Sequence, residues 1–421
     1  MGMDARHSIF ANSHRAALAN QTDYFLILSS HFETFLMIGQ SGISFSRTLF
    51  DAYGTFRLRD FSGRHFQPEI LHDVLRRLGE QAPGVVSSRV AGASFEGRPI
   101  YHLSAGAGPT SILLWSQMHG DESTATMAIA DILNYLVTMK GEEPAGQILS
   151  SLTLHFLPML NPDGAARCQR RTAQGIDMNR DALALVTPEA RILRQLHAEL
   201  HPQFAFNLHD QELSTVGSSR ELAAIGLLAP AFDEQKSDND VRRRARHLAS
   251  IFAVTMREFA EGKIARYDDT FEPRAFGDNM QKGGTSTLLV ESGHAMNDPE
   301  KGFIRQLNVV GILTSLYAIA TGEVERGNIA AYESLPFNGK KAYDMIIRNA
   351  VIDHGGSVRT KVDLGISYQI DTHSGPEPLL VDLGDLSTYI ALKESDARGA
   401  ILPASSIEVG KPIEMRQLIQ A

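Results

Sequence analysis

Apolar runs, most of them continuous, recur through the middle of the chain, and amphipathic segments separate them. Six of these runs have the length of buried strands: 98–104, 112–116, 152–157, 204–208, 223–228 and 286–290. Strands that are apolar along their whole length are typical of sheets that are covered on both faces. The pattern therefore predicts an α/β fold in which a mixed central sheet is flanked by helices on both faces.

Five further segments place apolar residues at helical spacing: 68–79, 124–139, 188–200, 240–260 and 302–320. The helix at 188–200 has the clearest start, because Thr187 is a suitable N-cap and Pro188 fits the first helical position. These segments complete the alternation of strand and helix that the predicted fold requires.

The pattern of predicted helices and strands divides the chain into three parts. Residues 1–56 precede the regular pattern, and we expect an irregular extension there. Residues 57–328 contain the alternating strands and helices. Residues 335–421 consist of short β-type runs separated by turn residues, which predicts a small C-terminal β module. The apolar stretch 24–39 contains ionisable residues and matches no signal-peptide pattern, so we expect no membrane span in it.

Composition narrows the possible partners. The chain has 40 Lys and Arg against 49 Asp and Glu, which gives a formal net charge of -9 and a pI of about 5.9. An acidic protein is not attracted to nucleic acid or to an anionic membrane, so we expect neither partner. The single cysteine, Cys168, excludes an intramolecular disulfide and fits a reducing compartment. We therefore expect a cytoplasmic protein, whose oligomeric state the sequence leaves open.

A pair of candidate metal ligands follows the second apolar run. His119 and Glu122 stand three residues apart directly after 112–116, so both side chains project to one side of a helical turn. An isolated His-x-x-Glu pair is more often a surface pair. This pair, however, lies at the carboxyl end of a buried strand, where α/β proteins place their sites. A catalytic zinc ion takes three protein ligands and keeps one open position, so a third ligand is required.

His209 is the candidate for the third ligand, because it directly follows the buried run 204–208. The competing histidines lie inside a strand, in or at the end of a helix, or after a later strand: His155, His197, His201 and His294. They are less suitable as ligands, although His294 remains a candidate for a supporting role. Glu291 follows the last run, 286–290, and is the candidate general base, because a carboxylate there can take a proton from a metal-activated water. The alternative for Glu291 is a salt-bridged acid at a strand end.

Cationic and amide side chains gather after the third run. Residues 161–164, Asn-Pro-Asp-Gly, are typical of a turn. Arg170, Arg171, Asn179 and Arg180 follow them. Near a zinc ion, such groups are suited to hold the oxyanion that forms at an amide carbonyl, or to bind a substrate carboxylate in bidentate fashion.

Together these motifs resemble the zinc carboxypeptidase family of the carboxypeptidase A type, in a bacterial-looking member with a C-terminal β module. The resemblance spans roughly residues 90–322 and rests on the order of HxxE, NPDG, GIDMNR, a later His after a strand and a Glu after the last strand. It implies one zinc ion, held by His119, Glu122 and His209.

The resemblance also implies roles for the remaining site residues. Arg170 stands five residues before the Gly of GIDMNR and would stabilise the oxyanion, whereas Arg171 fits that position less well. Asn179 and Arg180 would bind the C-terminal carboxylate of the substrate, and Glu291 would be the base. The family often supplies a capping tyrosine, but the surroundings of Tyr267 depart from the family pattern.

The sequence thus predicts a zinc-dependent metallocarboxypeptidase that hydrolyses the C-terminal peptide bond of a peptide or acyl-amino acid with a free carboxylate. One alternative is an N-acyl amino acid deacylase of the desuccinylase and aspartoacylase type. Another is a non-catalytic zinc-binding protein, which the presence of all three ligands and of Glu291 disfavours. Arg274 and Asp278 either line the specificity pocket or order their loop, so the side chain preferred at the cleaved residue stays open.

Overall fold

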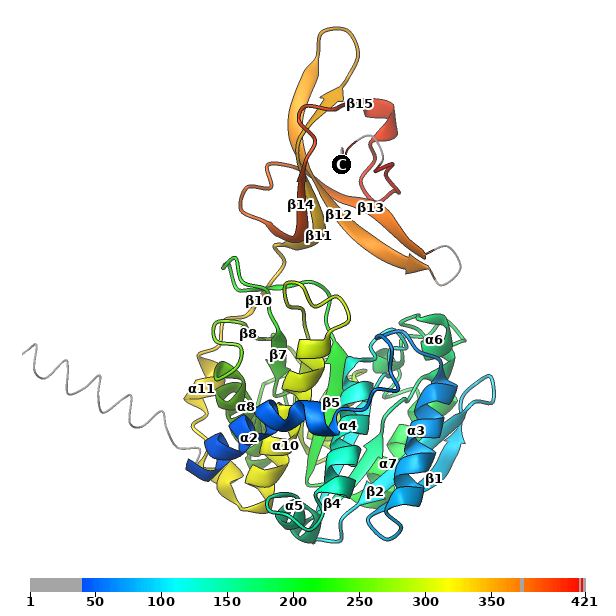
Figure 1. Cartoon of the computed structure of the whole chain (residues 1–421), viewed down its shortest axis with the longest axis vertical. Coiled ribbons are helices and arrows are strands. Elements are labelled where there is room, and N and C mark those ends of the chain that lie inside the picture. Colours follow the sequence, from blue (N-terminus) through cyan, green and yellow to red (C-terminus); the bar gives the residue numbers. More distant parts are fainter. Residues whose placement is uncertain (1–39, 372–374, 416–417, 419–421) are drawn as a thin grey trace, which may run out of the picture.

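The computed structural model describes residues 40–371, 375–415 and 418 (Figure 1). Its larger part is built on a sheet of eight strands in the order β1-β2-β4-β3-β5-β9-β7-β8. The bounds of these strands are β1 Val86–Ala93, β2 Pro99–Ala105, β3 Thr110–Ser116, β4 Leu152–Leu157, β5 Phe204–Asp210, β7 Ile225–Leu228, β8 Ile264–Arg266 and β9 Ser286–Ser292. The central strands β4, β3, β5 and β9 are parallel, whereas β2 and β7 pair antiparallel with β4 and β9. The predicted mixed sheet is therefore confirmed.

Helices cover both faces of this sheet. One face packs against α2 Gln40–Phe56, α3 Pro68–Gln81, α4 Thr124–Thr138, α5 Ala145–Ser151, α8 Asp240–Arg257 and α10 Gly302–Ala320. The other face packs against α7 Pro188–Leu200 and α9 Phe276–Lys282. On β3, Leu114 belongs to the first core and its neighbour Trp115 to the second. Successive side chains of a strand point to opposite faces, so a strand buried on both sides must be apolar throughout.

Helix α10 has buried apolar residues on all of its sides. Among the described residues it is the one helix long and apolar enough to cross a membrane, and 78% of the tested stretch is buried inside the protein. It packs against α2, α4 and α8. A helix that is surrounded by other elements is expected to be hydrophobic on all sides, and its packing therefore accounts for its composition.

The N-terminal prediction was wrong for residues 40–56, which form helix α2 and not an irregular segment. Phe45, Leu49 and Tyr53 of this helix are buried in the main core. The apolar positions recur at helical spacing, but their partners lie on distant helices, so the segment has no recognisable context in the sequence. Residues 1–39, including the apolar stretch 24–39, lie outside the described residues.

The Asn-Pro-Asp-Gly motif was predicted as a turn, but it begins a helix, α6 Pro162–Arg167. The Asn161 side chain accepts a hydrogen bond from the Gly164 amide, and Pro162 occupies the first helical position, as an N-cap and N1 pair should. Asp163 is fully buried and accepts bonds from the Ser94 hydroxyl and the Glu96 amide. Its role in the structure is thus to anchor the loop between β1 and β2.

A second, smaller sheet forms the C-terminal β module, residues 342–415, which is the separate lobe in orange and red in Figure 1. Its strands are β11 Ala342–Asp353, β12 Arg359–Asp371, β13 Gly375–Gly384, β14 Ile390–Asp396 and β15 Ile401–Pro403. It has its own core, which includes Ile347, Leu364 and Leu380. Before it come the short helix α11 Ala330–Glu333 and strand β10 Asn338–Gly339, which pairs with β6 Thr215–Val216.

Buried histidines make the stability of the fold dependent on pH. His102 on β2 contacts His155 on β4 at 3.1 Å between ring nitrogens, and His197 contacts the Thr285 hydroxyl at 2.8 Å. Burial lowers the pKa of both His102 and His197 from 6.5 to about 4. Because the unfolded chain takes up these protons first, the stabilisation is present above pH 6.5 and is lost as the pH falls towards 4.

We therefore expect the free energy of unfolding to fall by roughly 2 kcal/mol per histidine between pH 7 and pH 5. Urea unfolding at several pH values measures this loss. The double variant His102→Gln/His197→Gln should show a flatter dependence over the same range, since neither glutamine titrates. An unchanged slope in the double variant would assign the acid sensitivity to other groups.

Candidate metal centre

The turn that follows β3 places His119 and Glu122 side by side. The Glu122 amide donates to the His119 carbonyl at 3.1 Å, and both side chains are almost fully buried. The turn packs directly on α6: a Cβ atom on Gly120 would lie 2.0 Å from the carbonyl carbon of Gly164. Only glycine permits this backbone approach, so the NPDG segment positions the metal-ligand turn.

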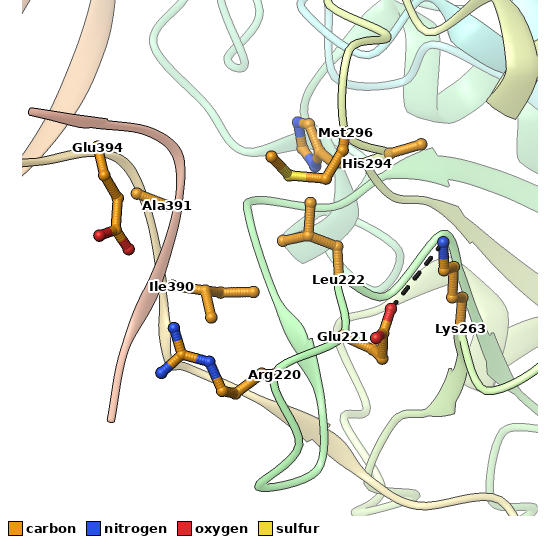
Figure 2. Close-up of a pocket in the computed structure, with 10 residues that line it drawn as sticks. Arg220, Glu221, Leu222, Lys263, His294, Met296, Ile390, Ala391 and Glu394 are labelled. Carbon is orange, nitrogen blue, oxygen red and sulfur yellow. Dashed lines mark ion pairs between the residues drawn. The ribbon is translucent and has the colours of Figure 1, made fainter. Parts of the chain in front are cut away.

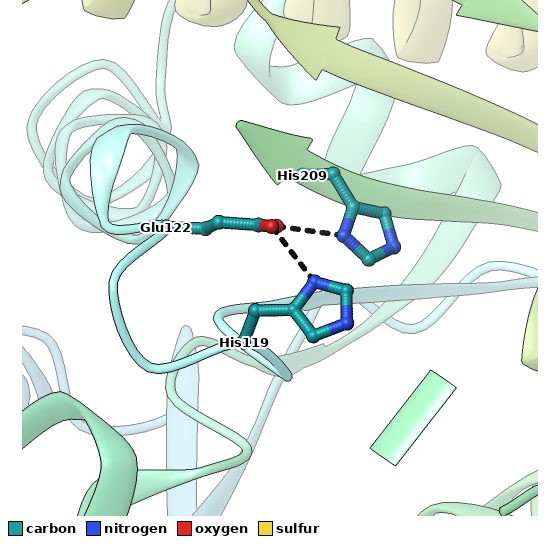
Figure 3. A group of neighbouring side chains, drawn as sticks. All are labelled: His119, Glu122 and His209. Carbon is teal, nitrogen blue, oxygen red and sulfur yellow. Dashed lines mark hydrogen bonds and ion pairs between the residues drawn. The ribbon is translucent and has the colours of Figure 1, made fainter. Parts of the chain in front are cut away.

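His209 comes from the neighbouring strand β5 and completes a cluster with the other two side chains (Figure 3). The Nδ1 atom of His119 lies 2.8 Å from Glu122 Oε1, and the Nδ1 atom of His209 lies 2.7 Å from Glu122 Oε2. One potential ligand atom from each residue lies within 4.8 Å of the others. The three residues singled out as ligands in the sequence are therefore brought together.

Asp177 supports the cluster and was not identified from the sequence. Its Oδ1 atom lies 3.0 Å from His119 Nε2, the ring nitrogen that faces away from Glu122. A carboxylate in this position fixes the orientation and tautomer of a metal-binding imidazole. The available signal was its place within GIDMNR, two residues before Asn179.

Arg170 joins the same network. Its Nη1 atom donates to Glu122 Oε1 at 2.9 Å, and its Nη2 atom to Asp177 Oδ2 at 3.2 Å. The guanidinium is 47% exposed, so it borders the site and remains accessible from solvent. Arg171 instead donates to the Gly175 carbonyl and lies on the surface. The two adjacent arginines thus have different surroundings: Arg170 contacts the cluster, and Arg171 does not.

The electrostatics of the cluster favour a bound cation. Burial alone would raise the pKa of Glu122, but His119 and His209 outweigh it and hold that pKa well below its usual range. Burial alone would lower the pKa of His119, but the Glu122 and Asp177 carboxylates raise it to about 9. The buried Glu122 carboxylate therefore stabilises a positive charge at this point.

The donor set fits zinc. Two imidazoles and one carboxylate, converging from a turn and a strand, form the three-ligand arrangement of catalytic zinc sites. His119, Glu122 and His209 would hold the ion, with the Nδ1 atoms as the nitrogens that face the carboxylate. Binding would displace the protons that these atoms now share.

Glu291 lies beside this cluster on β9, directly opposite His209 in the register of β5 and β9. Its Oε2 atom is buried and has no hydrogen-bond partner among the described residues. Burial, aided by the charge of Glu122, raises the pKa of Glu291 to about 8. Glu291 forms no ion pair with the residues that the structure describes, so the alternative of a salt-bridged acid at the strand end has no support in this part of the chain.

Asn179 and Arg180 lie on a short helical turn, η1 Met178–Arg180, next to Asp177. The Asn179 side-chain oxygen accepts a bond from the Phe276 amide at 3.0 Å, which ties this turn to α9. Arg180 is 42% exposed, and its Nε atom lies 3.6 Å from Glu272. Arg180 therefore offers an accessible guanidinium, whereas the Asn179 oxygen is already used within the fold.

The loop between β8 and α9 borders the same region. Glu272 receives two bonds from the Arg274 guanidinium at 2.9 and 2.7 Å, and its amide donates to Asp278. These contacts give Arg274 and Asp278 a part in ordering the loop. Tyr267 donates its hydroxyl to Gln211 Oε1 at 2.8 Å, and Gln211 lies two residues after His209. His294 forms no bond to any of the three candidate ligands.

Comparison with known proteins finds partial matches to carboxypeptidases. Residues 71–209 match the family model described as zinc carboxypeptidase. The chain is 27% identical over 260 residues to a "Probable carboxypeptidase 2" of Trichophyton verrucosum, which covers 57% of this chain and 49% of the relative. It is 23% identical over 223 residues to human "Carboxypeptidase D", covering 44% of this chain and 16% of that protein. The chain thus spans about half the length of the fungal relative.

Solved structures of carboxypeptidases align with part of the chain. A metallo-carboxypeptidase from Pseudomonas aeruginosa, in complex with (2-guanidinoethylmercapto)succinic acid, aligns with a TM-score of 0.49 at 17% identity. The alignment covers 62% of this chain and 70% of that one. A putative carboxypeptidase A from Shewanella denitrificans also aligns with a TM-score of 0.49, at 18% identity, over 65% of this chain and 70% of its own.

Proposed function

We propose that this chain, whose residues 71–209 match the zinc carboxypeptidase family model, is a zinc-dependent metallocarboxypeptidase. Its substrate would be a peptide or an acyl-amino acid with a free C-terminal carboxylate. The observation that supports this most directly is the meeting of four side chains at one sheet edge. His119, Glu122 and His209 converge on one point, and Glu291 lies opposite His209 with an unpartnered carboxylate oxygen.

Each residue has a task that follows from its surroundings. When bound, zinc supplies Lewis-acid activation of a water molecule and of the scissile carbonyl. Glu291 takes a proton from the attacking water and passes it to the departing nitrogen. Burial raises the pKa of the Glu291 carboxyl group, which favours retention of that proton until the nitrogen departs. Arg170, next to Glu122, stabilises the negative charge that develops on the carbonyl oxygen.

Arg180 would bind the C-terminal carboxylate of the substrate, because its guanidinium is accessible and lies on the turn that begins at Asp177. We expect Arg180→Met to raise KM about 10- to 100-fold for peptides with a free C-terminus, as lost charge-assisted bonds should. Arg171→Met is the matched control, since Arg171 bonds only to the Gly175 carbonyl. Steady-state kinetics of both variants test this role, and equal KM values would contradict it.

Metal removal tests the proposed function as a whole. Dialysis against a chelator should abolish hydrolysis, and one equivalent of zinc per chain should restore it. The substrates to compare are peptides with free C-termini, the same peptides with amidated C-termini, and succinyl- and acetyl-amino acids. Hydrolysis restricted to the acylated amino acids would support the deacylase alternative. A zinc-loaded protein that hydrolyses none of them would support the non-catalytic alternative.

A further inference from the structure

A cavity of about 310 Å³ lies between the α/β domain and the C-terminal β module (Figure 2). We call it the inter-domain cleft. One wall includes Arg220, Leu222, His294 and Met296 of the α/β domain, and the other includes Ile390 and Glu394 of the module. Leu222 packs against Ala342 and Ile390, and Arg220 donates to the Ser387 carbonyl at 3.0 Å. The module is therefore docked on the α/β domain at this cleft.

Two segments of the chain connect the cleft with the candidate metal centre. His294 and Met296 follow directly after β9, which contains Glu291. Arg220 and Leu222 belong to the connection between β5, which contains His209, and β7. Because Ile225 of β7 pairs with Ser292 of β9, both segments lie at the carboxyl edge of the sheet. Asn179 and Arg180 instead follow β4, which lies beyond β3 in the sheet.

The charged groups of the cleft are unequally neutralised. Glu394 of the module is paired with the Arg348 guanidinium at 2.9 Å, and Glu221 faces Lys263 at 3.9 Å. Arg220 is exposed and forms no ion pair with any residue that the structure describes. The Arg348 guanidinium is shared between Glu394 and Asp363, so the cleft carries charges of both signs. Its Arg220 guanidinium, which has no ion-pair partner among the described residues, can bind an anionic group of a ligand.

A second polar group in the cleft also lacks a partner. The Nδ1 atom of His294 is buried and forms no hydrogen bond within the described part of the chain. Buried ring nitrogens in native structures nearly always have a partner, so an unpaired one beside a cavity indicates a site for a ligand or water. Apolar surface from Leu222, Met296 and Ile390 completes the lining.

We propose that the inter-domain cleft binds the substrate residues upstream of the scissile bond, and that Arg220 selects an acidic side chain there. This inference rests on the proposed carboxypeptidase function. The C-terminal β module then determines specificity, because it supplies one wall of the subsite. The cavity volume is suited to one or two amino-acid residues rather than to a folded partner.

The test uses zinc-loaded full-length protein and acetylated peptides that share one C-terminal dipeptide. Glu or Gln is placed at one of the three positions that directly precede this shared dipeptide. We expect a kcat/KM at least about tenfold higher for Glu than for Gln at one of these positions. In Arg220→Gln this ratio should fall to about one, and Arg220→Lys should keep part of it.

Lys393→Gln is the matched control, because Lys393 is an exposed cation on β14 that does not line the cleft; it should keep the wild-type ratio. Wild-type protein without any Glu preference, or a preference that persists in Arg220→Gln, would overturn the subsite. Absence of hydrolysis for every peptide would instead overturn the proposed function, so the two failures are distinguishable.

A second, independent observation concerns Lys301, whose side chain is almost completely buried. Its Nζ atom donates to Asp210 Oδ2 at 3.0 Å and to the Ser292 carbonyl at 3.1 Å. Asp210 follows His209 on β5, and Ser292 follows Glu291 on β9. One ammonium group therefore joins the ends of the two strands that present a metal ligand and the base.

The contact extends to the metal centre itself. The Asp210 amide donates to Glu122 Oε2 at 3.1 Å, and the Thr124 hydroxyl donates to Asp210 at 2.5 Å. Lys301 adopts a left-handed backbone conformation with φ of 51°, which is unfavourable for a lysine. A strained backbone and a buried cation each cost folding free energy, and both occur here beside the candidate metal centre.

We propose that Lys301 is a positioning residue, which fixes Glu291 relative to His209 during catalysis of the proposed reaction. Lys301→Met should lower kcat at least about tenfold while KM stays within about twofold and zinc stays bound, because a small displacement of a catalytic group slows the chemical step. Lys301→Arg should restore part of the loss. Unchanged kcat in Lys301→Met would contradict this role.

Lys301→Met leaves the Asp210 carboxylate buried without its cation. The double variant Lys301→Met/Asp210→Asn removes both charges, so no unpaired charge stays buried. If the double variant unfolds at the wild-type urea concentration but still has reduced kcat, positioning is supported. If its kcat returns to the wild-type value, Lys301 serves only to neutralise Asp210, and the proposal fails.

Discussion

Glu291→Gln is expected to lower kcat about 10²- to 10⁴-fold, the range typical of a lost general base, while the protein keeps its zinc. Glutamine has nearly the same shape as glutamate but cannot take a proton from water. Glu291 makes no ion pair and its Oε2 atom has no hydrogen-bond partner in the described chain, so the substitution breaks no structural contact at that atom. The loss should therefore appear in kcat and not in stability.

The measurements are steady-state kinetics, zinc content and urea unfolding of the same preparations. Glu261→Gln is a matched control, because Glu261 is exposed and lies after α8, away from the metal-ligand cluster. Near-normal kcat in Glu291→Gln would remove the residue from the mechanism. Loss of zinc from the variant would instead mean that Glu291 acts on the metal site.

The largest effect on stability is expected at Asp131, which is fully buried on α4. Its two carboxylate oxygens accept bonds from the Arg305 guanidinium at 2.7 and 2.5 Å, from the Tyr53 hydroxyl at 2.7 Å and from the Leu58 amide at 2.9 Å. One carboxylate thus joins α4 to α10, to α2 and to the segment after α2.

Asp131→Ala should lower the free energy of unfolding by about 3–5 kcal/mol, because it leaves the Arg305 charge buried without a partner. The double variant Asp131→Leu/Arg305→Met should cost less than the single one, since no charge then remains buried. Asp73→Ala is the control for an exposed pair: Asp73 lies 3.7 Å from Arg76 on the surface, and its loss should cost less than about 1 kcal/mol. Urea unfolding compares all three, and a cost for Asp131→Ala as small as that of Asp73→Ala would refute this account.

Asp131 also illustrates a limit of sequence patterns. It stands among the apolar residues of α4, where the helical pattern gives no reason for a carboxylate. Its partners are 78 residues away at Tyr53 and 174 residues away at Arg305. The same network explains why the helix at residues 40–56 was not predicted, since that helix is stabilised by packing against distant elements.

The α/β class, the strands at the centre of the sheet and the candidate ligands could be predicted from local sequence patterns. Local rules were sufficient because the strands are apolar throughout and polar residues begin where each strand ends. His119, Glu122, His209 and Glu291 were found in this way. Parallel strands present their carboxyl ends at one edge, so these four residues were expected at the same edge of the sheet.

The groups that surround that edge could not be predicted, because long-range packing brings them there. Asp177 behind His119, Lys301 between the ends of β5 and β9, and the cleft beneath the C-terminal β module involve contacts between residues far apart in the chain. The sequence pattern reports the burial of a residue but not its partner across the sheet. Partner identity depends on register and packing, and these are set by the whole fold rather than by any one segment.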